Sequence, residues 1–396
     1  MADLEEDVVT RKELLGTFFL IGATSYGGPA IVARIHQVIV HGKRWLTEEE
    51  FEESVAFCQI LPGPVAVQLA THIGWRLHGG LGALLVSVSY TLPAFGLMLA
   101  LSAATFRFGH LPLVDAILKG LGAAVSGIVA DATLSMARSS LKDWRGALIA
   151  LGAAAAFFTR QDALVVLLGA AIAGACLTLH LFRPVAEPPA VRPGRPCPPG
   201  GTGAFSIFVL AALFLALVAA GALRDPGYPA LGLAMMKVNL LAFGGGYTAI
   251  ALMYQQVVTH HAWLTAKEFI TGMALSQITP GPVIVNATFI GYKLGGWLGA
   301  IYSTFCVFWP SGLLLVLLAP HFARIRSSPI LKACVRGLLA AFIAMLVFVL
   351  WQMASASIHG PSTAALAVGA FVALRVDVHP IWIILATVVL AAGGGL

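Results

Sequence analysis

Residues 59–64 read QILPGP, and nearly the same motif returns as QITPGP at residues 277–282. Each copy lies within an apolar run that otherwise favours a helix. A proline inside a helix removes one hydrogen bond and clashes with the preceding turn, at a cost of about 3 kcal/mol. Two prolines that flank a glycine therefore predict a broken helix, and the repetition predicts that this break occurs twice.

The composition is that of an integral membrane protein. Of the 396 residues, 59% are hydrophobic and only 11% are charged, whereas soluble domains carry about 25% charged residues. Apolar runs of about 20 residues recur along the chain and predict spanning helices in a lipid bilayer. The net charge is +6, and in a membrane protein the basic residues are expected mainly in cytoplasmic loops. The chain lacks the combination of basic and aromatic residues that would indicate a nucleic-acid partner.

No catalytic pattern emerges from the chain. The five cysteines have neither metal-ligand nor disulfide spacing. Phosphate loops, nucleophile and base pairs, and metal-ligand clusters are not apparent, so we predict no enzyme, no cofactor and no metal. The acidic start lacks the basic region and cleavage site of a signal peptide, so the first membrane helix is expected to be retained.

The strongest signal is an internal duplication. At a shift of 218, WLTEEEFEESVAFCQILPGP (45–64) aligns with WLTAKEFITGMALSQITPGP (263–282), with eleven of 20 positions identical. After a one-residue gap, GWRLHGGLGA (74–83) aligns with GYKLGGWLGA (291–300). We therefore predict four parts: a first transporter repeat at 1–182, a proline-rich cytoplasmic linker at 183–204, an additional transmembrane helix at 205–223, and a second repeat at 224–396.

Counting apolar segments predicts an all-α fold of two inverted repeats with discontinuous helices. Each repeat holds about six segments, including a glycine-broken one (14–40, 231–258) and a proline-broken one (50–77, 268–295), and the extra helix brings the total to 13. An odd number of spans between equivalent points turns the second repeat upside down, as in many secondary transporters. The fifth segment of each repeat is short, but pairing it with the sixth as a re-entrant hairpin preserves the inversion.

The distribution of basic residues predicts the orientation. With 13 spans, Arg11, Lys12 and Lys267 fall on the side that receives more arginine and lysine, whereas Lys43 and Arg44 fall on the other. The richer side is expected to be cytoplasmic. This places the N-terminus inside the cell and the C-terminus outside.

The broken helices are the predicted binding site. A helix that starts after each break exposes its first N–H groups and carries about half a positive charge there, which attracts anions. Two such ends facing each other suit a small, highly charged anion; the alternative is a plain kink that neighbouring helices relieve. The residues are Pro62, Gly63 and Pro64 in the first repeat, and Pro280, Gly281 and Pro282 in the second.

Other candidates surround these breaks in matching pairs. The amides Gln59, Gln68, Gln277 and Asn286 can donate to an oxyanion, or else form hydrogen bonds between helices. Gly27, Gly28, Gly245 and Gly246 permit unwound backbone that lines a site, or else close helix packing. Lys119 and Arg336 align with each other and suggest anion attraction or gating. Asp131 is the acid placed best inside an apolar run.

The two halves resemble a known family. The stretches SYGGPAIVARI, KRWLTEEEF and CQILPGPVAVQLATHIGWRLHG of the first half, with FGGGYTAIALM, WLTAKEF and SQITPGPVIVNATFIGYKLGG of the second, are similar to the chromate ion transporter family, long two-repeat type. The resemblance implies efflux of chromate, a tetrahedral dianion like sulfate, across a bacterial cytoplasmic (inner) membrane, conferring chromate resistance. The alternatives are exchange of sulfate or another oxyanion, or an anion channel; a homodimer is left open.

Overall fold

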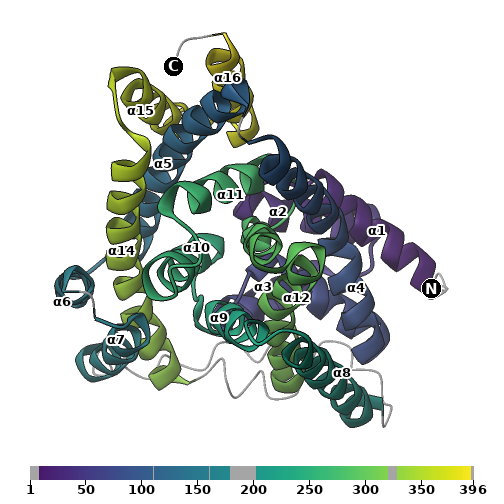
Figure 1. Cartoon of the computed structure of the whole chain (residues 1–396). Coiled ribbons are helices and arrows are strands. Elements are labelled where there is room, and N and C mark those ends of the chain that lie inside the picture. Colours follow the sequence, from purple (N-terminus) through teal and green to yellow (C-terminus); the bar gives the residue numbers. More distant parts are fainter. Residues whose placement is uncertain (1–8, 110, 160, 179–201, 320–327, 394–396) are drawn as a thin grey trace.

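The computed structural model describes residues 9–109, 111–159, 161–178, 202–319 and 328–393, and every regular element among them is helical (Figure 1). The first repeat comprises α1 (Arg11–Thr24), α2 (Gly28–His36), the π-helix η1 (Gln37–Gly42), α3 (Glu48–Ile60), α4 (Val65–Phe108), α5 (Pro112–Ser140), α6 (Trp144–Phe158) and α7 (Ala163–Thr178). Helix α8 (Thr202–Arg224) follows, and residues 183–201 of the predicted linker lie outside the described part. The second repeat comprises α9 (Tyr228–Leu241), α10 (Gly246–Tyr254), the π-helix η3 (Gln255–His260), α11 (Ala266–Ile278), the short 3-10 helix η4 (Val283–Val285), α12 (Asn286–Leu318), α14 (Pro329–Ser357), α15 (Pro361–Arg375) and α16 (Pro380–Ala392).

The duplicated sequence folds into duplicated elements. Helices α2, η1 and α3 return 218 positions later as α10, η3 and α11, with the same lengths. Helices α5 and α6 return 217 positions later as α14 and α15, again with the same lengths. The one-residue gap falls at the start of α4 and its counterpart, between the proline break and Gly74 or Gly291, so the kinks at 78–79 and 295–296 are also 217 positions apart.

Each proline-flanked break is the tip of a helical hairpin. Glu50 lies in the first turn of α3 and Arg76 lies beyond the break, yet their side chains form an ion pair at 3.1 Å. On one straight helix they would be separated by about 39 Å, at 1.5 Å per residue. The rings of Phe57 and His72 also lie 5.3 Å apart, so the two legs run antiparallel.

The second repeat has the same hairpin, since Lys293 pairs with Glu268 at 2.6 Å. The prediction that residues 50–77 and 268–295 each form one broken span is therefore wrong, and the total of 13 spans is not confirmed. A reversal also follows the first break of the chain. Lys43, at the end of η1, pairs with Glu13 in the first turn of α1 at 2.8 Å, so Lys43 lies at the same end of the molecule as the start of α1.

A second reversal follows each hairpin. Helix α4 loses helical geometry at His78 and Gly79, whose φ is +63°, and α12 does so at Gly295 and Gly296, whose φ is +60°. After the reversal the chain packs back on the preceding leg through a glycine contact. A Cβ on Gly74 would lie 2.5 Å from the carbonyl oxygen of Gly82, so the absence of side chains lets the two legs approach closely.

The long second halves of α4 and α12 pass through the molecule in opposite directions. Leu84 and Val316 line one small cavity, which places the start of one half beside the end of the other. At the far end of α4, Phe106 stacks on Phe289 at 4.9 Å, and Lys293 lies 5.4 Å from the Phe106 ring. The outer ends of the two repeats therefore lie on opposite sides of the molecule.

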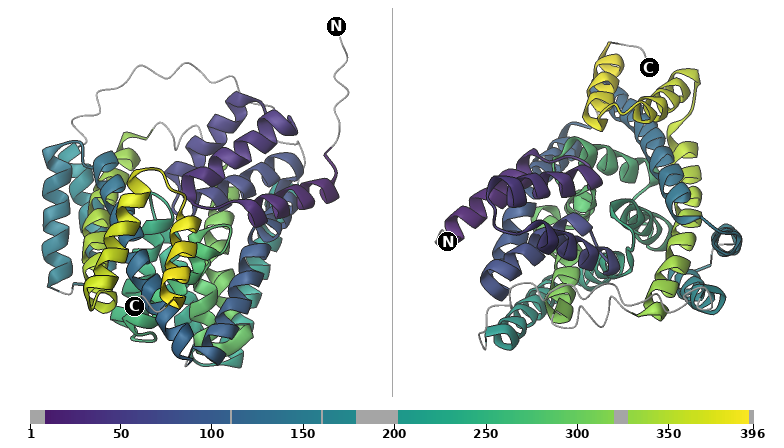
Figure 2. Two further views of the ribbon diagram at one scale, coloured as in Figure 1. Left: turned by 90° about the horizontal axis from the view of Figure 1, so that it is seen from above. Right: turned by 180° about the vertical axis from the view of Figure 1, so that it is seen from behind.

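The repeats also exchange their last helices. Helices α6 and α7 pack on α14 of the second repeat, whereas α15 and α16 pack on α5 of the first (Figures 1 and 2). Ser126 and Ser357 join α5 to α14 by a hydrogen bond of 2.9 Å. The two halves are thus interlocked around one common core.

The helices confirm an all-α membrane protein. Among the described residues, four stretches are long and apolar enough to cross a membrane: α4, α5, η4 with α12, and α14. The helices α6, α7, α15 and α16 are apolar but shorter, between 10 and 17 residues. Such lengths fall below the roughly 20 residues of a full span.

Candidate functional site

The hairpin tips of the two repeats meet inside the molecule. The N–H of Gly63 donates to the carbonyl oxygen of Ala242 at 2.8 Å, and the N–H of Gly281 donates to that of Ser25 at 2.7 Å. Ala242 and Ser25 directly follow α9 and α1. Each proline-flanked tip thus binds the glycine break of the other repeat. Within each repeat the helices that start at the two breaks also pack together, α2 on α4 and α10 on η4. The four breaks therefore form one cluster. We call it the tip cluster: residues 25–27, 61–64, 242–245 and 279–282.

The tip cluster needs glycine at two positions. The φ angle is +120° at Gly63 and +101° at Gly281, a region that disfavours residues with a Cβ. A Cβ on Gly63 would lie 2.6 Å from the Cβ of Ser311, and one on Gly281 would lie 3.0 Å from that of Ala94. Ser311 and Ala94 are equivalent residues, each after a proline inside its helix. The predicted motif glycines are therefore fixed both by backbone conformation and by the other repeat.

Four helices start at the tip cluster without a side-chain cap. They are α2 after Gly27, α4 after Pro64, α10 after Gly245, and η4 with α12 after Pro282. Three helix starts at the outer ends carry side-chain caps, from Thr10 and from the capping boxes that begin at Thr47 and Thr265. The N–H groups and positive dipole ends at the centre are therefore left for another acceptor.

Buried amides beside the breaks also have unused hydrogen-bonding atoms. Gln68 and Asn286, the predicted equivalent pair, are both fully buried. Gln68 donates to the carbonyl oxygen of Pro62, but its Oε1 has no partner among the described residues, and neither side-chain polar atom of Asn286 has one. Buried polar atoms are normally satisfied, so unpartnered atoms here are consistent with a polar ligand or water at the breaks.

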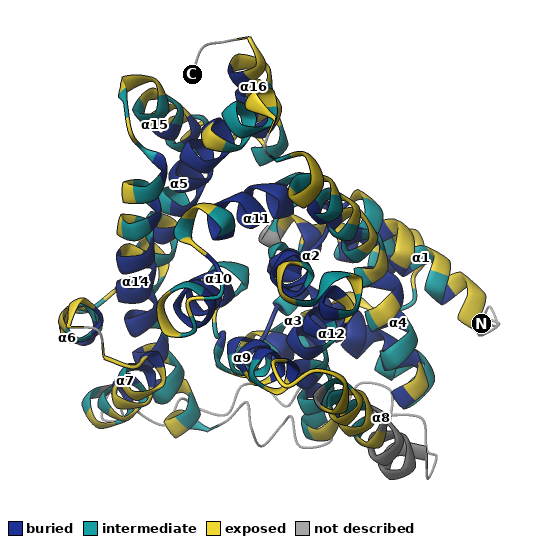
Figure 3. Ribbon diagram, in the orientation of Figure 1, coloured by how far each residue is buried: buried dark blue, intermediate teal, exposed yellow. Residues whose placement is uncertain are grey.

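The second predicted amide pair, Gln59 and Gln277, lies in two different environments. Gln59 is exposed and lines a groove of about 470 Å³ between α2 and α3, together with Val32 and Glu52. Its equivalent Gln277 is buried, and its Nε2 has no partner among the described residues. The first repeat is open at this place, whereas α10 and α11 of the second are mostly buried (Figure 3).

The predicted cations Lys119 and Arg336 lie outside the tip cluster. Lys119 is 58% exposed and pairs at 2.8 Å with Asp115, near the start of α5. Arg336 is exposed on α14. Both lie on the exposed surface rather than in the buried cluster.

A third hairpin, formed by α15 and α16, brings in a cation that was not among the predicted site residues. Arg375, at the end of α15, pairs with Asp131 of α5 at 3.5 Å. The next helix starts after His379, whose ring lies 5.9 Å from that of Tyr26 in the tip cluster. The turn between α15 and α16 therefore reaches the cluster. Its signal in the sequence is the shortness of the fifth segment, which cannot carry Arg375 across a whole membrane.

Asn239 is a second residue that the sequence analysis missed. Its Nδ2 donates to the carbonyl oxygen of Val307 at 2.6 Å, and its Oδ1 accepts from the N–H of Ser311 at 2.7 Å. These are backbone groups that the neighbouring Pro310 releases from the helix ladder. A lone amide in the apolar run of α9 was the available signal, and Ile21 stands at the equivalent position of the first repeat.

This architecture defines a class of protein. Interlocked repeats, long apolar helices and broken helix ends buried at the centre are the features of a membrane transporter built from internal repeats. The family described as chromate transporter matches residues 12–175 and 229–392, and the chain belongs to this family.

The chain is similar to several curated proteins over most of its length. It is 32% identical to a chromate transport protein of Cupriavidus metallidurans, over 90% of this chain and 86% of that protein. It is 28% identical to a chromate transport protein of Pseudomonas aeruginosa, over 85% and 80%, and 31% identical to an uncharacterized transporter of Methanocaldococcus jannaschii, over 84% and 82%. No solved structure matches the chain.

Proposed function

We propose that this protein exports chromate across the bacterial inner membrane and thereby confers chromate resistance. The proposal rests on family membership and on the relatives of Cupriavidus and Pseudomonas that are named chromate transport proteins. Chromate is a divalent oxyanion, so its binding site must supply hydrogen-bond donors and positive potential.

The observation that carries the proposal is the convergence of four uncapped helix starts on the tip cluster. Each contributes about half a positive charge, so together they match the charge of a dianion without a fixed cation. The side-chain N–H groups of Gln277 and Asn286, which have no partner among the described residues, add neutral donors that can orient tetrahedral oxygens. Gln68 joins them only if its Nε2 releases the carbonyl oxygen of Pro62. Gly27 and Gly245, with φ angles of +78° and +117°, hold the unwound backbone before two of these starts, and Gly28 and Gly246 are the first residues of α2 and α10.

The two repeats supply an alternating pathway. Because the outer ends of the repeats lie on opposite sides of the molecule, insertion in the membrane makes them inverted repeats. The groove at Gln59 leads in from the first repeat, whereas the equivalent place at Gln277 is closed. We assign this arrangement to one of two states, which exchange when the first hairpin closes and the second opens.

The open side is assigned to the cytoplasm. Lys43 pairs with Glu13, which moves Lys43 and Arg44 to the side of Arg11 and Lys12. Lys267 is reassigned to the side opposite the N-terminus, since it pairs with Asp115 at that end of the molecule. These changes widen the excess of basic residues on the N-terminal side, as the positive-inside rule requires of a cytoplasmic face.

Export of a dianion needs no coupling ion. Moving one charge through 100 mV is worth about 2.3 kcal/mol, so a dianion that leaves a negative interior gains about 4.6 kcal/mol. At about 1.4 kcal/mol per tenfold ratio, this sustains a gradient of roughly three decades. Import would need an additional driving ion.

The test is chromate uptake into everted membrane vesicles under an imposed potential, with and without sulfate. We expect saturable uptake that P62A/P280A abolishes while leaving membrane insertion intact. The matched control is P112A/P329A, which changes equivalent prolines at the starts of α5 and α14 and should retain uptake. Absence of uptake by the unmodified protein would refute chromate transport.

The alternatives give different results in the same vesicles. Sulfate that competes with chromate and accelerates its flux from the opposite side indicates an oxyanion exchanger. Flux that does not saturate, and that substrate on the opposite side does not stimulate, indicates an anion channel.

A further inference from the structure

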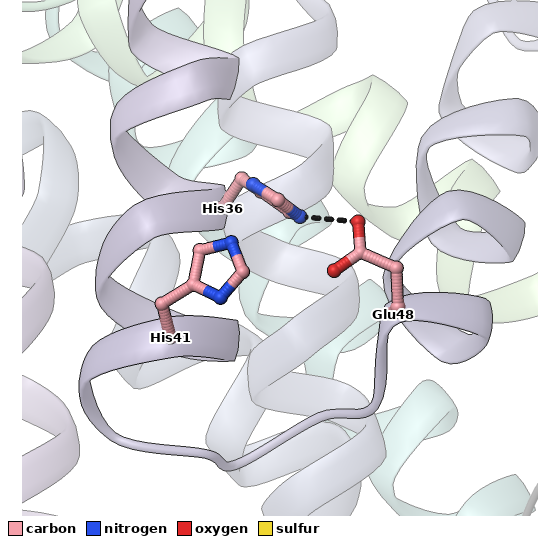
Figure 4. Close-up of side chains that lie close together, drawn as sticks. All are labelled: His36, His41 and Glu48. Atoms are coloured by element: carbon pink, nitrogen blue, oxygen red, sulfur yellow. Dashed lines mark hydrogen bonds and ion pairs between the residues drawn. The ribbon is translucent and has the colours of Figure 1, made fainter.

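A cluster of three possible metal ligands lies at the rim of the groove (Figure 4). His36 ends α2, His41 lies in η1, and Glu48 starts α3. One ligand atom from each side chain can be chosen so that all three lie within 4.8 Å of one another. Nε2 of His36 is 2.6 Å from Oε1 of Glu48, and the two imidazole rings lie 4.9 Å apart.

The π-helix explains why this cluster is hidden in the sequence. In a regular α-helix, side chains three or four positions apart share a face, and His36 and His41 are five apart. The wider turn of η1 brings them together, and the reversal after Gly42 adds Glu48 from the next helix. Linear spacing alone therefore gives no metal motif, which is why the sequence analysis predicted no metal.

We propose that His36, His41 and Glu48 bind a divalent transition metal ion of the Zn²⁺ type. Imidazole nitrogens and one carboxylate are the ligands that such ions prefer, and water completes the coordination. Ligands of a tetrahedral zinc site lie about 2.0–2.2 Å from the metal, hence about 3.3 Å from one another. Side-chain movements of about 1.5 Å bring the three atoms to these distances, and the metal replaces the contact between His36 and Glu48.

The site is accessible and its local charge suits a cation. The side chains of His36 and Glu48 are 27% and 53% exposed, so an ion reaches them from the groove. Glu52 lines the same groove and adds negative charge. The nearby cation Lys43 is held by Glu13.

The second repeat shows that the fold does not require these three residues. Its η3 and α11 have the same geometry, but Tyr254, Thr259 and Ala266 occupy the three equivalent positions. The ligand set is therefore separate from the paired features of the tip cluster. It is a property of α2, η1 and α3 of the first repeat alone.

The test is titration of the purified full-length protein in detergent, without an affinity tag, with Zn²⁺ alone. We expect about one saturable ion per chain by calorimetry, and at least tenfold weaker binding in H36A and in E48A. Bound Co²⁺ should give an absorption band that reports low coordination number in the unmodified protein and disappears in H36A/H41A.

The control is H260A/H261A, which removes the adjacent histidine pair that follows η3, with ring centroids 4.5 Å apart. It should bind Zn²⁺ as the unmodified protein does. Size-exclusion profiles establish that each variant remains folded, which the exposure of the site favours. Equal Zn²⁺ binding by H36A/H41A/E48A and the unmodified protein, or no saturable binding at all, would overturn the proposal. Because chromate is absent from these measurements, their outcome is independent of the transport assay.

Discussion

The neighbouring helices α2 and α3 have the same lengths as their equivalents α10 and α11, but the two pairs have different surroundings. Helix α11 packs between α5, α14 and α16, and α10 packs on α14, whereas α2 and α3 pack mainly on α4. Residues 248–254 of α10 are all buried, whereas Ile31 and Ile35 are the only buried residues within 30–36 of α2. Duplicated sequence therefore sets equivalent secondary structure, while the environment of each hairpin sets whether it is open or closed.

A second pair of equivalent contacts differs in chemistry. Asp131 and Arg375 form an ion pair between α5 and α15. The equivalent positions in the other half are Phe348 and Phe158, whose rings meet at 5.4 Å. The scaffold accepts either contact, so the charges of Asp131 and Arg375 are not a requirement of helix packing. The turn that follows Arg375 reaches the tip cluster through the contact of His379 with Tyr26, so the pair is a candidate for the proposed anion pathway.

The largest effect is expected at the tips. Gly63→Ala introduces a Cβ against Ser311 at a left-handed position, and should destabilise the protein by about 3 kcal/mol or more and abolish transport. Gly79→Ala is the control, because its φ is also positive but nothing lies within 4 Å, so it should cost only the backbone strain of about 1–3 kcal/mol. Thermal unfolding in detergent measures both. Equal melting temperatures for the two variants would show that the tip is not closely packed.

The open and closed hairpins are distinguished by chemical access. In a protein whose five cysteines are replaced, Gln59→Cys should react with a membrane-impermeant thiol reagent at least tenfold faster than Gln277→Cys. The reason is that Gln59 lines the groove whereas Gln277 is buried. Labelling of purified protein followed by mass spectrometry gives the two rates. Similar rates would contradict the assignment of one open and one closed hairpin.

The ion pair and the phenylalanine pair are compared by exchange. Asp131→Ala should lower stability by about 1 kcal/mol, because the pair is partly exposed. D131F/R375F copies the contact of the other half and should recover much of this loss, yet transport should stay impaired. A double-mutant cycle on melting temperature, with vesicle uptake in parallel, separates the two effects. Normal uptake by D131F/R375F would remove the pair from the anion pathway.

The smallest effect is expected at the outer ends, where the repeats are alike. Thr47→Ala and Thr265→Ala each remove the cap of a capping box and should cost about 1 kcal/mol. Both variants should retain transport, since neither residue lies in the tip cluster. Chemical unfolding is the measurement. A cost at one site but not at the other would show that the outer ends also differ.

The sequence predicted what depends on local chemistry. Two prolines around a glycine break a helix in any surroundings, so the positions of the breaks at 61–64 and 279–282 followed directly. The amide pair Gln68 and Asn286 followed from the duplication, and the structure buries both beside the breaks.

What the sequence did not predict depends on contacts between distant residues. Hydropathy is the same whether the chain continues or reverses after a break, and the reversal is visible only in the pairing of Arg76 with Glu50. The partner of each tip is likewise a backbone carbonyl in the other repeat, which carries no residue signature. The pairing of Arg375 with Asp131 was not predicted either, because a helix count assumes that every apolar segment crosses the membrane.

The exchange of the last helices imposes an order on biosynthesis. Helix α7 ends at Thr178 and its partner α14 begins at Pro329, about 150 residues later on the ribosome. At about 5–20 residues per second, the nascent first half waits roughly 8–30 s for its packing surface. During that interval α6 and α7 are held by lipid and by the insertion machinery rather than by the protein. A ribosome stalled within the second repeat would therefore leave a membrane-inserted but unassembled half, a natural target for quality-control proteolysis.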